Sequence, residues 1–283
     1  MTTPADTTIA VFGLGIIGSR SADQLKQHGF SVKTWNRSPK DREDSVSSPQ
    51  EAATGADFLA FYLKDGQAMR EVFGAIQDTL QPQQTVLNHS TIDLETTQWL
   101  AAQCEEIGCR FLDCPFTGSK VAAGQGQLVY FVGGDQAVLD HSRQVLEATS
   151  KEIKLIGPVG SATVIKIATN LISASTVQAL SEALAITTAN GIQPEVLTES
   201  VASNVCGSIL AAMKLPTMAS GDFDTHFSLE NMLKDSRFAL ELADRAGIET
   251  PGIAATSAAM EDGCKKGNAS LDFSALYKAY HTT

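Results

Sequence analysis

A glycine-rich turn near the N-terminus has the spacing of a phosphate-binding loop. The apolar run Thr8–Phe12 leads into Gly13-Leu14-Gly15-Ile16-Ile17-Gly18. In a strand–turn–helix setting, the first glycine permits the tight turn, the second lets the backbone approach a pyrophosphate, and the third lets the helix pack against the strand. The helix N-terminus adds free N–H groups and the positive end of its dipole. These six residues are therefore predicted to contact a dinucleotide; a turn that serves packing alone is the alternative.

The residues after the next predicted strand, Ser31–Trp35, bear on which dinucleotide binds. NAD-binding folds carry an Asp or Glu near this point to accept a hydrogen bond from the ribose 2′-hydroxyl. Here Asn36, Arg37 and Ser38 follow the strand. A carboxylate would repel a 2′-phosphate, whereas a guanidinium pairs with it bidentately. We therefore expect NADP(H), held by these three residues; a solvated charged loop is the alternative. Two more basic residues follow: Lys40 and Arg42.

A lysine and an amide share one face of a long predicted helix, Ser161–Asn190. Lys166 and Asn170 are four residues apart, and Ser173 extends the same face. Burying a lysine or an amide without a partner is costly, so this polar stripe is either paired internally or lines a cavity. From residue type alone, a structural ion pair or a lysine that reaches solvent is favoured over catalysis.

The rest of the same helix is apolar around most of its circumference. A helix of this kind is buried on more than one side. We expect coverage by both domains or by a partner chain, and hence a homo-oligomer, a dimer or a tetramer. Two shorter helices with an unseen break are the alternative.

Strand-like and helix-like segments alternate up to about residue 157, and no convincing strand follows. This alternation predicts an α/β Rossmann-type N-terminal domain with a parallel-rich sheet, plus an all-α C-terminal domain joined by a long interdomain helix. We place the domains at residues 1–158 and 159–283. The expected strands are Thr8–Phe12, Ser31–Trp35, Phe58–Tyr62, Thr85–Asn88, Arg110–Leu112, Val129–Val132 and Ile153–Ile156, and the expected helices are Ile17–His28, Gln67–Leu80, Leu94–Ile107 and Gln136–Glu147.

Composition excludes several classes of protein. The 283 residues include 21 Lys and Arg against 32 Asp and Glu, a net charge of −11, which repels a nucleic-acid backbone. No apolar run is long enough to span a membrane, and the N-terminus lacks the pattern of a secretory signal. We therefore expect a cytoplasmic protein with neither nucleic acid nor membrane as partner. No metal is expected either, because the five cysteines form no CxxC pair and the histidines show no metal-ligand spacing: His28, His89, His141, His226 and His281.

Three further segments, read with the glycine turn, resemble the β-hydroxyacid dehydrogenase family, especially its branch of glyoxylate and succinic-semialdehyde reductases. The first is Asp113-Cys114-Pro115-Phe116-Thr117-Gly118-Ser119-Lys120, similar to that branch's DAPVSGSK signature. The second is Gly157-x-x-Gly160-x5-Lys166-x3-Asn170, and the third is Phe227-x-Leu229-x4-Lys234-Asp235. The departures from the family pattern are Ile17 for Met, Cys114 for Ala, Phe116 for Val and Thr117 for Ser.

The resemblance implies roles that residue type alone did not. It makes Lys166 the general acid/base, and Thr117, Gly118, Ser119 and Asn170 the substrate-binding residues. It also places Leu63 and Lys234 against the cofactor and Thr91 against both the cofactor and the substrate. Phe227 and Asp235 are placed in the substrate pocket.

The implied function is NADPH-dependent reduction of a small aldehyde acid, such as glyoxylate or succinic semialdehyde, or oxidation of a 3-hydroxy acid. Imine reductases share the architecture but commonly carry Asp or Tyr where this chain has Lys166. The 6-phosphogluconate dehydrogenase type has a much larger C-terminal domain. A non-catalytic NADPH-binding protein is the remaining alternative.

Overall fold

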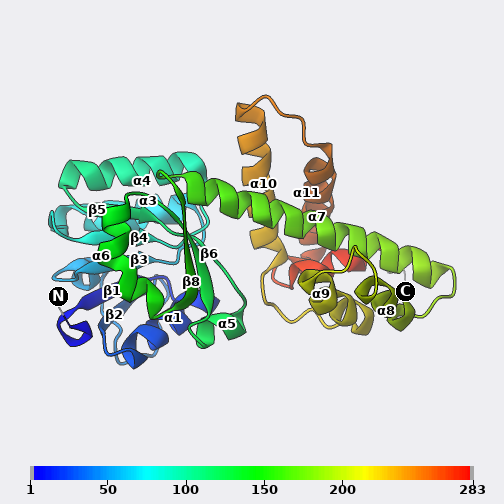
Figure 1. Ribbon diagram of the computed structural model, residues 1–283, viewed down its shortest axis with the longest axis horizontal. Helices are drawn as coiled ribbons and strands as arrows, with labels where there is room; N and C mark the ends of the chain where they lie inside the picture. The colour runs from blue at the N-terminus through cyan, green and yellow to red at the C-terminus, as the bar shows by residue number, and fades with distance from the viewer. Residues whose placement is uncertain (1–2, 281–283) are drawn as a thin grey trace. The chain divides into compact units, whose positions relative to one another are not determined.

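The computed structural model describes residues 3–280 and divides the chain into two compact units, Met1–Lys166 and Ile167–Thr283 (Figure 1). The first unit contains every strand of the described chain, and the second is built from helices. The expected fold class, a Rossmann-type α/β domain followed by an all-α domain, is confirmed.

The sheet of the first unit has the strand order β2-β1-β3-β4-β5-β7-β6, with β8 paired to β7. Strands β1 to β5 are parallel neighbours, whereas β7 runs antiparallel to β5 and β6. The sheet is thus parallel-rich rather than wholly parallel. The strands are β1 (Thr8–Phe12), β2 (Ser31–Trp35), β3 (Phe58–Phe61), β4 (Thr85–Asn88), β5 (Arg110–Asp113), β6 (Phe116–Thr117), β7 (Leu128–Gly133) and β8 (Ser150–Gly157).

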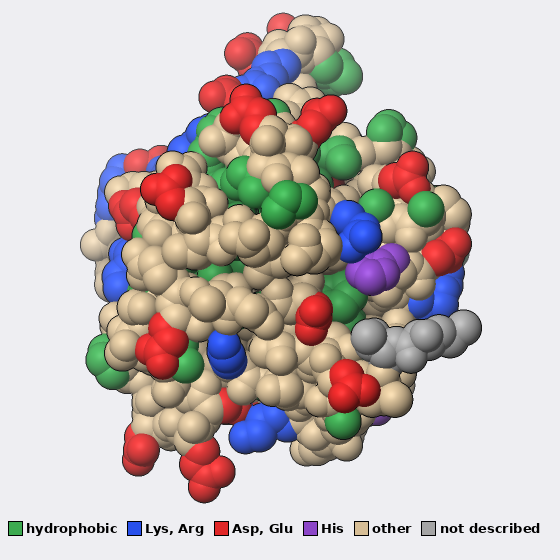
Figure 2. Space-filling model, turned by 90° about the vertical axis from the view of Figure 1, so that its left-hand side faces the viewer, with side chains coloured by type: hydrophobic (Ala, Val, Ile, Leu, Met, Phe, Trp, Pro, Cys, Tyr) green, Lys and Arg blue, Asp and Glu red, His purple; other side chains and the backbone are tan. Residues whose placement is uncertain are grey.

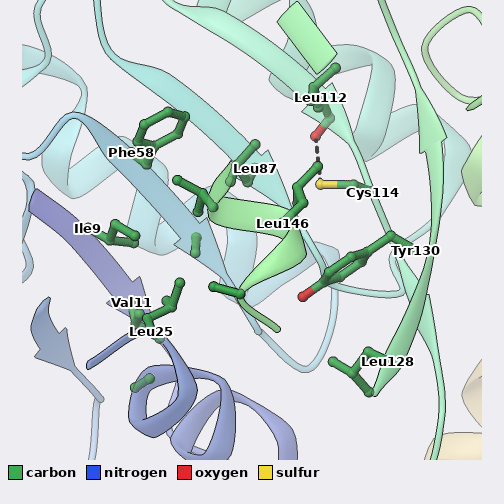
Figure 3. Close-up of a cluster of buried hydrophobic side chains, with 14 of the residues drawn as sticks. Ile9, Val11, Leu25, Phe58, Leu87, Leu112, Cys114, Leu128, Tyr130 and Leu146 are labelled. Carbon is green, nitrogen blue, oxygen red and sulfur yellow. Dashed lines mark hydrogen bonds between the residues drawn. The ribbon is translucent and has the colours of Figure 1, made fainter. Parts of the chain in front are cut away.

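Helices cover both faces of this sheet because its strands are apolar on both sides. Along β1, Ile9 and Val11 join the core on one face, which Figure 3 draws, and Ala10 and Phe12 join the other. Helices α1, α5 and α6 bury side chains in the first core, and α2, α3 and α4 in the second. The helices are α1 (Ile16–Gln27), α2 (Pro49–Ala53), α3 (Gly66–Ile76), α4 (Leu94–Ile107), α5 (Lys120–Gly124) and α6 (Gln136–Glu147).

The second unit packs four helices and a short C-terminal 3₁₀ segment around the greater part of α7. Helix α7 runs unbroken over Ser161–Ala189, so the alternative of two shorter helices is wrong. No strand of the sheet lies within residues 161–280. The other elements are α8 (Pro194–Ala202), α9 (Ile209–Ser220), α10 (Leu229–Arg245), α11 (Pro251–Gly263), the π-helical segment η3 (Cys264–Asn268) and η4 (Phe273–Ala279).

Burial of α7 is less complete than its sequence suggests. Ala174 and Val177 are fully buried against α10 and α11 side chains. Ile172 and Ile186, however, each leave 63% of their surface exposed. The apolar circumference of the helix is therefore only partly covered by this chain itself.

Charged side chains of both signs are intermixed on the face that Figure 2 draws. Figure 2 shows Asp and Glu side chains scattered over one face, with Lys and Arg among them. No helix within the described residues is long and apolar enough to cross a membrane. Phosphate groups would therefore need a local set of donors in this chain, because its net charge repels anions.

Candidate functional site

Two of the three motif glycines are required by the fold of the turn between β1 and α1. Gly13 has φ +95°, and a Cβ there would overlap the carbonyl oxygen of Tyr62. A Cβ on Gly18 would overlap the carbonyl oxygen of Gly13. These glycines allow the tight turn and the close packing of helix on strand.

The middle glycine, Gly15, has no such reason within the chain. Its φ of −73° suits any residue, and no atom lies within 4 Å of where a Cβ would be. Gly15 is the N-cap of α1, whose first turn has no side-chain cap and no acidic residue. Open space in front of free helix N–H groups fits the approach of a pyrophosphate, and so the loop fits a dinucleotide.

Asn36 positions the glycine turn. Its Oδ1 accepts a hydrogen bond from the backbone N–H of Leu14 at 2.9 Å, and its Nδ2 donates to the carbonyl of Ser38 at 2.8 Å. The missing acidic residue at this point is thus replaced by an amide that joins the β2 end to the turn. Charge arguments from sequence did not reveal this contact.

The two arginines after β2 have different surroundings. Arg37 is 68% exposed and pairs with Glu71 of α3 at 2.7 Å. Arg42 instead pairs with Asp44 at 2.8 Å and Asp23 at 2.7 Å. Partial burial raises the pKa of Asp44, but hydrogen bonds from Arg42, Lys26 and Thr34 outweigh it and lower that pKa to about 2. Arg42 is thus mostly covered and held by two carboxylates, whereas Arg37 is mostly exposed and pairs with one.

The carboxyl ends of β3 and β4 carry the next predicted residues, Leu63 and Thr91. The N–H of Leu63 donates to Ser90 Oγ at 2.8 Å, and that hydroxyl donates to the carbonyl of Phe61 at 3.1 Å. Since β1, β3 and β4 are parallel neighbours, these loops and the glycine turn share one edge of the sheet. This edge is where ligands bind in open α/β sheets.

Behind these loops lies a buried aromatic group that sequence did not predict. His89 stacks against Tyr62 and lies at a tilt against Tyr130, each with a ring-centroid distance of 4.7 Å, and one ring nitrogen contacts the carbonyl of Cys114. Burial lowers the pKa of His89 to about 4 and raises that of Tyr62 to about 12. Both groups are uncharged near neutral pH, so they support the loops as a neutral layer.

The Thr117-Gly118-Ser119 segment joins the edge strand β6 to α5. Thr117 and Gly118 are exposed, and Ser119 Oγ caps α5 by accepting from the N–H of Ala122 at 3.3 Å. Gly118 has φ +136°, a conformation that favours glycine. The hydroxyl groups of Thr117 and Ser119 thus flank Gly118 beside β6, the last strand in the sheet order.

Asp113, the first residue of the same motif, joins the sheet to α7. Its buried carboxylate accepts from the N–H and the hydroxyl of Thr163, both at 2.9 Å. Burial raises the pKa of Asp113 to about 6, although the Thr163 hydrogen bonds oppose that rise. The contact fixes the first turn of α7, one turn before the half-buried Lys166. Sequence reasoning singled out the motif but assigned this residue no role.

In the second unit, three predicted residues are directly connected. Asn170 Nδ2 donates to Asp235 Oδ2 at 2.6 Å, and Lys234 Nζ donates to Asp235 Oδ1 at 2.7 Å. Lys234 also lies 4.7 Å from the centroid of the Phe238 ring. The buried Asp235 therefore links the second motif segment to the third.

Phe227 is positioned by a buried ion pair. Its ring meets Phe273 edge-on at 6.3 Å, and its N–H donates to Asp272 Oδ2 at 3.2 Å. Asp272 in turn pairs with Lys214 at 2.6 Å, with both side chains less than 10% exposed. No sequence signal had pointed to Lys214 or Asp272.

Two family models together match nearly all of the described chain. Residues 8–157 match the NAD binding domain of 6-phosphogluconate dehydrogenase, and residues 160–280 match the NAD-binding family of NADP-dependent 3-hydroxyisobutyrate dehydrogenase. The chain belongs to the β-hydroxyacid dehydrogenase family.

Similar proteins agree with this family. Glyoxylate/succinic semialdehyde reductase 2, chloroplastic, from Arabidopsis thaliana is 29% identical over 96% of this chain and 79% of its own length. An uncharacterized oxidoreductase of Synechocystis is 31% identical over 87% of this chain and 88% of its own. The 3-hydroxyisobutyrate dehydrogenase of Mycobacterium tuberculosis, solved with L-serine, superimposes with a TM-score of 0.88 at 25% identity, covering 98% of this chain and 99% of its own.

This β-hydroxyacid dehydrogenase is therefore an oxidoreductase that uses a nicotinamide cofactor. Within the second unit, Asn170, Lys234 and Asp235 of the family motifs contact one another directly. Within residues 3–280, no group of three or more His, Cys, Asp or Glu side chains could hold a metal ion, and His281 lies outside that range.

Proposed function

We propose that the protein reduces a short aldehyde acid with NADPH, or oxidises the corresponding hydroxy acid in reverse. The observation that carries this proposal is the Asn170–Asp235–Lys234 chain, because it joins the segment that resembles the family's catalytic stretch to the segment that resembles the reductase branch's motif. The Arabidopsis relative named for glyoxylate and succinic semialdehyde supports the same substrate class. We assign residues 1–158 to a cofactor-binding domain and residues 159–283 to a domain for substrate binding and oligomerisation, with some residues of each domain contributing to the other ligand.

Lys166 is proposed as the general acid. When bound, a reduced nicotinamide supplies a hydride to the carbonyl carbon. The ammonium group of Lys166 donates a proton to the alkoxide oxygen that forms, and in the reverse direction its neutral amine removes the hydroxyl proton. Asn170, one helical turn away, holds the substrate through its amide, and the hydrogen bond to Asp235 fixes the orientation of that amide.

Thr117, Gly118 and Ser119 are proposed to hold the substrate carboxylate. Two hydroxyl groups and the backbone N–H groups around a glycine make a concave set of donors for an anion. L-serine, present with the Mycobacterium tuberculosis relative, likewise carries a carboxylate and a β-hydroxyl group. Phe227 and Asp235 line the remainder of the pocket in this proposal.

The dinucleotide is proposed to bind along the shared edge of β1, β3 and β4. Residues 13–18 hold the pyrophosphate, Asn36, Arg37 and Ser38 hold the 2′-phosphate, and Leu63, Thr91 and Lys234 contact the rest of the cofactor. Part of the role of Asn36 is to orient the glycine turn, because its Oδ1 accepts a hydrogen bond from the backbone N–H of Leu14.

A substrate screen tests the function. Glyoxylate, succinic semialdehyde, 3-hydroxy acids and cyclic imines are each supplied with the matching form of the cofactor, and absorbance of NADPH is followed. We expect turnover of an aldehyde acid or a 3-hydroxy acid. Turnover of imines alone would favour C=N reduction, and cofactor binding without any turnover would favour a non-catalytic protein.

Reversal of charge at Arg37 tests the cofactor. In Arg37→Asp, the carboxylate repels the 2′-phosphate and can accept from a ribose hydroxyl, so KM for NADPH should rise at least tenfold while KM for NADH holds or falls. The matched control is Arg143→Asp on α6, where Arg143 pairs with neighbouring carboxylates. An unchanged NADPH preference in Arg37→Asp would rule out the assignment.

A homo-oligomer, a dimer or a tetramer, is proposed from the exposed apolar residues Ile172 and Ile186 of α7. Covering them with a second copy would remove apolar surface from water. Light scattering on the native protein and on Ile172→Glu measures the state directly. Cytoplasmic location stays a prediction.

A further inference from the structure

The Arg37–Glu71 ion pair lies where the proposed cofactor site would receive the 2′-phosphate. Glu71 Oε2 accepts from Arg37 Nη2 at 2.7 Å, and Glu71 Oε1 accepts from Gln67 Nε2 at 2.9 Å. Both carboxylate oxygens are thus held by donors. Glu71 is therefore oriented toward Arg37 from one turn of α3.

The topology puts this pair across the end of β1. Strand β1 lies between β2 and β3 in the sheet. Arg37 follows β2, and Glu71 belongs to the helix that follows β3, so their contact bridges the connections on either side of β1. The glycine turn leaves the sheet at this point, and it is tied to the β2 end because Gly13 N–H donates to the carbonyl of Trp35 at 3.0 Å.

We propose that Glu71 is a specificity-determining residue, whose carboxylate competes with a 2′-phosphate for Arg37 and so limits the preference for NADPH over NADH. The inference rests on the proposed role of Arg37. It adds an opposing carboxylate, supplied by a different element, which the sequence around the β2 end does not contain.

The competition is specific to the phosphorylated cofactor. A 2′-phosphate monoester carries close to two negative charges at neutral pH. To reach Arg37 it must displace the Glu71 carboxylate or share the guanidinium with it, and the two anions then repel each other. NADH carries a neutral hydroxyl at this position and meets no such repulsion.

The solvent exposure of Arg37 and Glu71 limits the size of the expected effect. Arg37 and Glu71 are 68% and 49% exposed, so solvent and salt screen their interactions. We therefore expect removal of the Glu71 charge to change affinity by roughly three- to tenfold, not by orders of magnitude. The change should shrink as ionic strength rises.

Glu71→Gln tests the proposal, because it removes the charge and keeps the size and shape of the side chain. The probes are 2′,5′-ADP and 5′-AMP, which differ by the 2′-phosphate alone, and their dissociation constants are measured by titration calorimetry at low and high salt. We expect 2′,5′-ADP to bind roughly three- to tenfold more tightly to the variant at low salt, with 5′-AMP changed less than twofold. The matched control is Glu147→Gln on α6, where Glu147 pairs with Arg143 and the change in net charge is the same.

The same titrations on Arg37→Ala and on the double variant separate the two proposals. We expect Arg37→Ala to weaken 2′,5′-ADP selectively and to abolish the gain from Glu71→Gln. If Arg37→Ala is selective but Glu71→Gln leaves 2′,5′-ADP binding unchanged or weaker, then Glu71 does not compete and the inference is overturned. If Arg37→Ala leaves the ratio of the two affinities unchanged, the assignment of Arg37 to the 2′-phosphate fails as well.

Discussion

Lys166→Ala is expected to lower kcat by about 10²- to 10⁴-fold while leaving NADPH affinity within about twofold. General acid catalysis by a positioned side chain contributes factors of about 10² to 10⁴. Alanine removes the proton donor and leaves helix α7 intact, because alanine is the best helix former. Turnover with the substrate found in the screen gives kcat, and titration calorimetry gives the affinity for NADPH.

Two comparisons make the Lys166 result specific. Lys166→Arg keeps a positive charge but holds its proton too tightly to exchange it, so it should recover little activity, above all in the direction of hydroxy-acid oxidation. Lys154→Ala removes an exposed lysine of β8 that pairs with Glu152, and should leave kcat unchanged. If Lys166→Ala keeps more than a tenth of the native kcat, proton transfer must come from another group.

Asp113→Asn is expected to remove a pH dependence from the stability of the first unit. Burial holds the pKa of Asp113 at about 6 in the folded chain, against 3.8 for an unperturbed carboxyl. Between these values the folded state binds more protons than the unfolded state, so the free energy of unfolding falls as pH rises. Between pH 5 and pH 8, ionisation of this single group should lower the free energy of unfolding of the native protein by about 1.4 kcal/mol. Almost all of this decrease occurs below about pH 7. The Asp113→Asn variant has no ionisable group at this position and so lacks this pH dependence.

The measurement can be confined to the first unit. The chain's two tryptophans, Trp35 and Trp99, both lie there, so their fluorescence during urea unfolding reports that unit alone. The free energy of unfolding of the native protein minus that of Asp113→Asn should decline from pH 5 to pH 8. Asp140→Asn, an exposed carboxylate on α6, is the control and should leave the pH slope unchanged. A difference that is flat with pH, or that rises, would show that burial does not raise the pKa of Asp113 into this range.

Much of the fold follows from local sequence patterns. The strands β1, β2 and β4 begin and end where the apolar runs predict, because those runs are strongly β-prone and bounded by polar turns. Helix α7 is continuous because no glycine or proline interrupts it for 29 residues. Short elements were missed: β6 has two residues, and α2 and α5 have five each. Elements of that length carry almost no periodic signal, and tertiary contacts decide whether they form.

In the candidate site, too, some features follow from the sequence and others only from the tertiary structure. The types and spacing of its residues determined the glycine turn, the family and the set of residues at issue, since each depends on neighbours along the chain. The tertiary structure alone decided which partners those residues meet: Arg37 with Glu71, Asp113 with Thr163, and Asn170 with Asp235. These partners are 34, 50 and 65 residues apart. No local pattern encodes a pairing over such distances, because it depends on which strands and helices lie side by side.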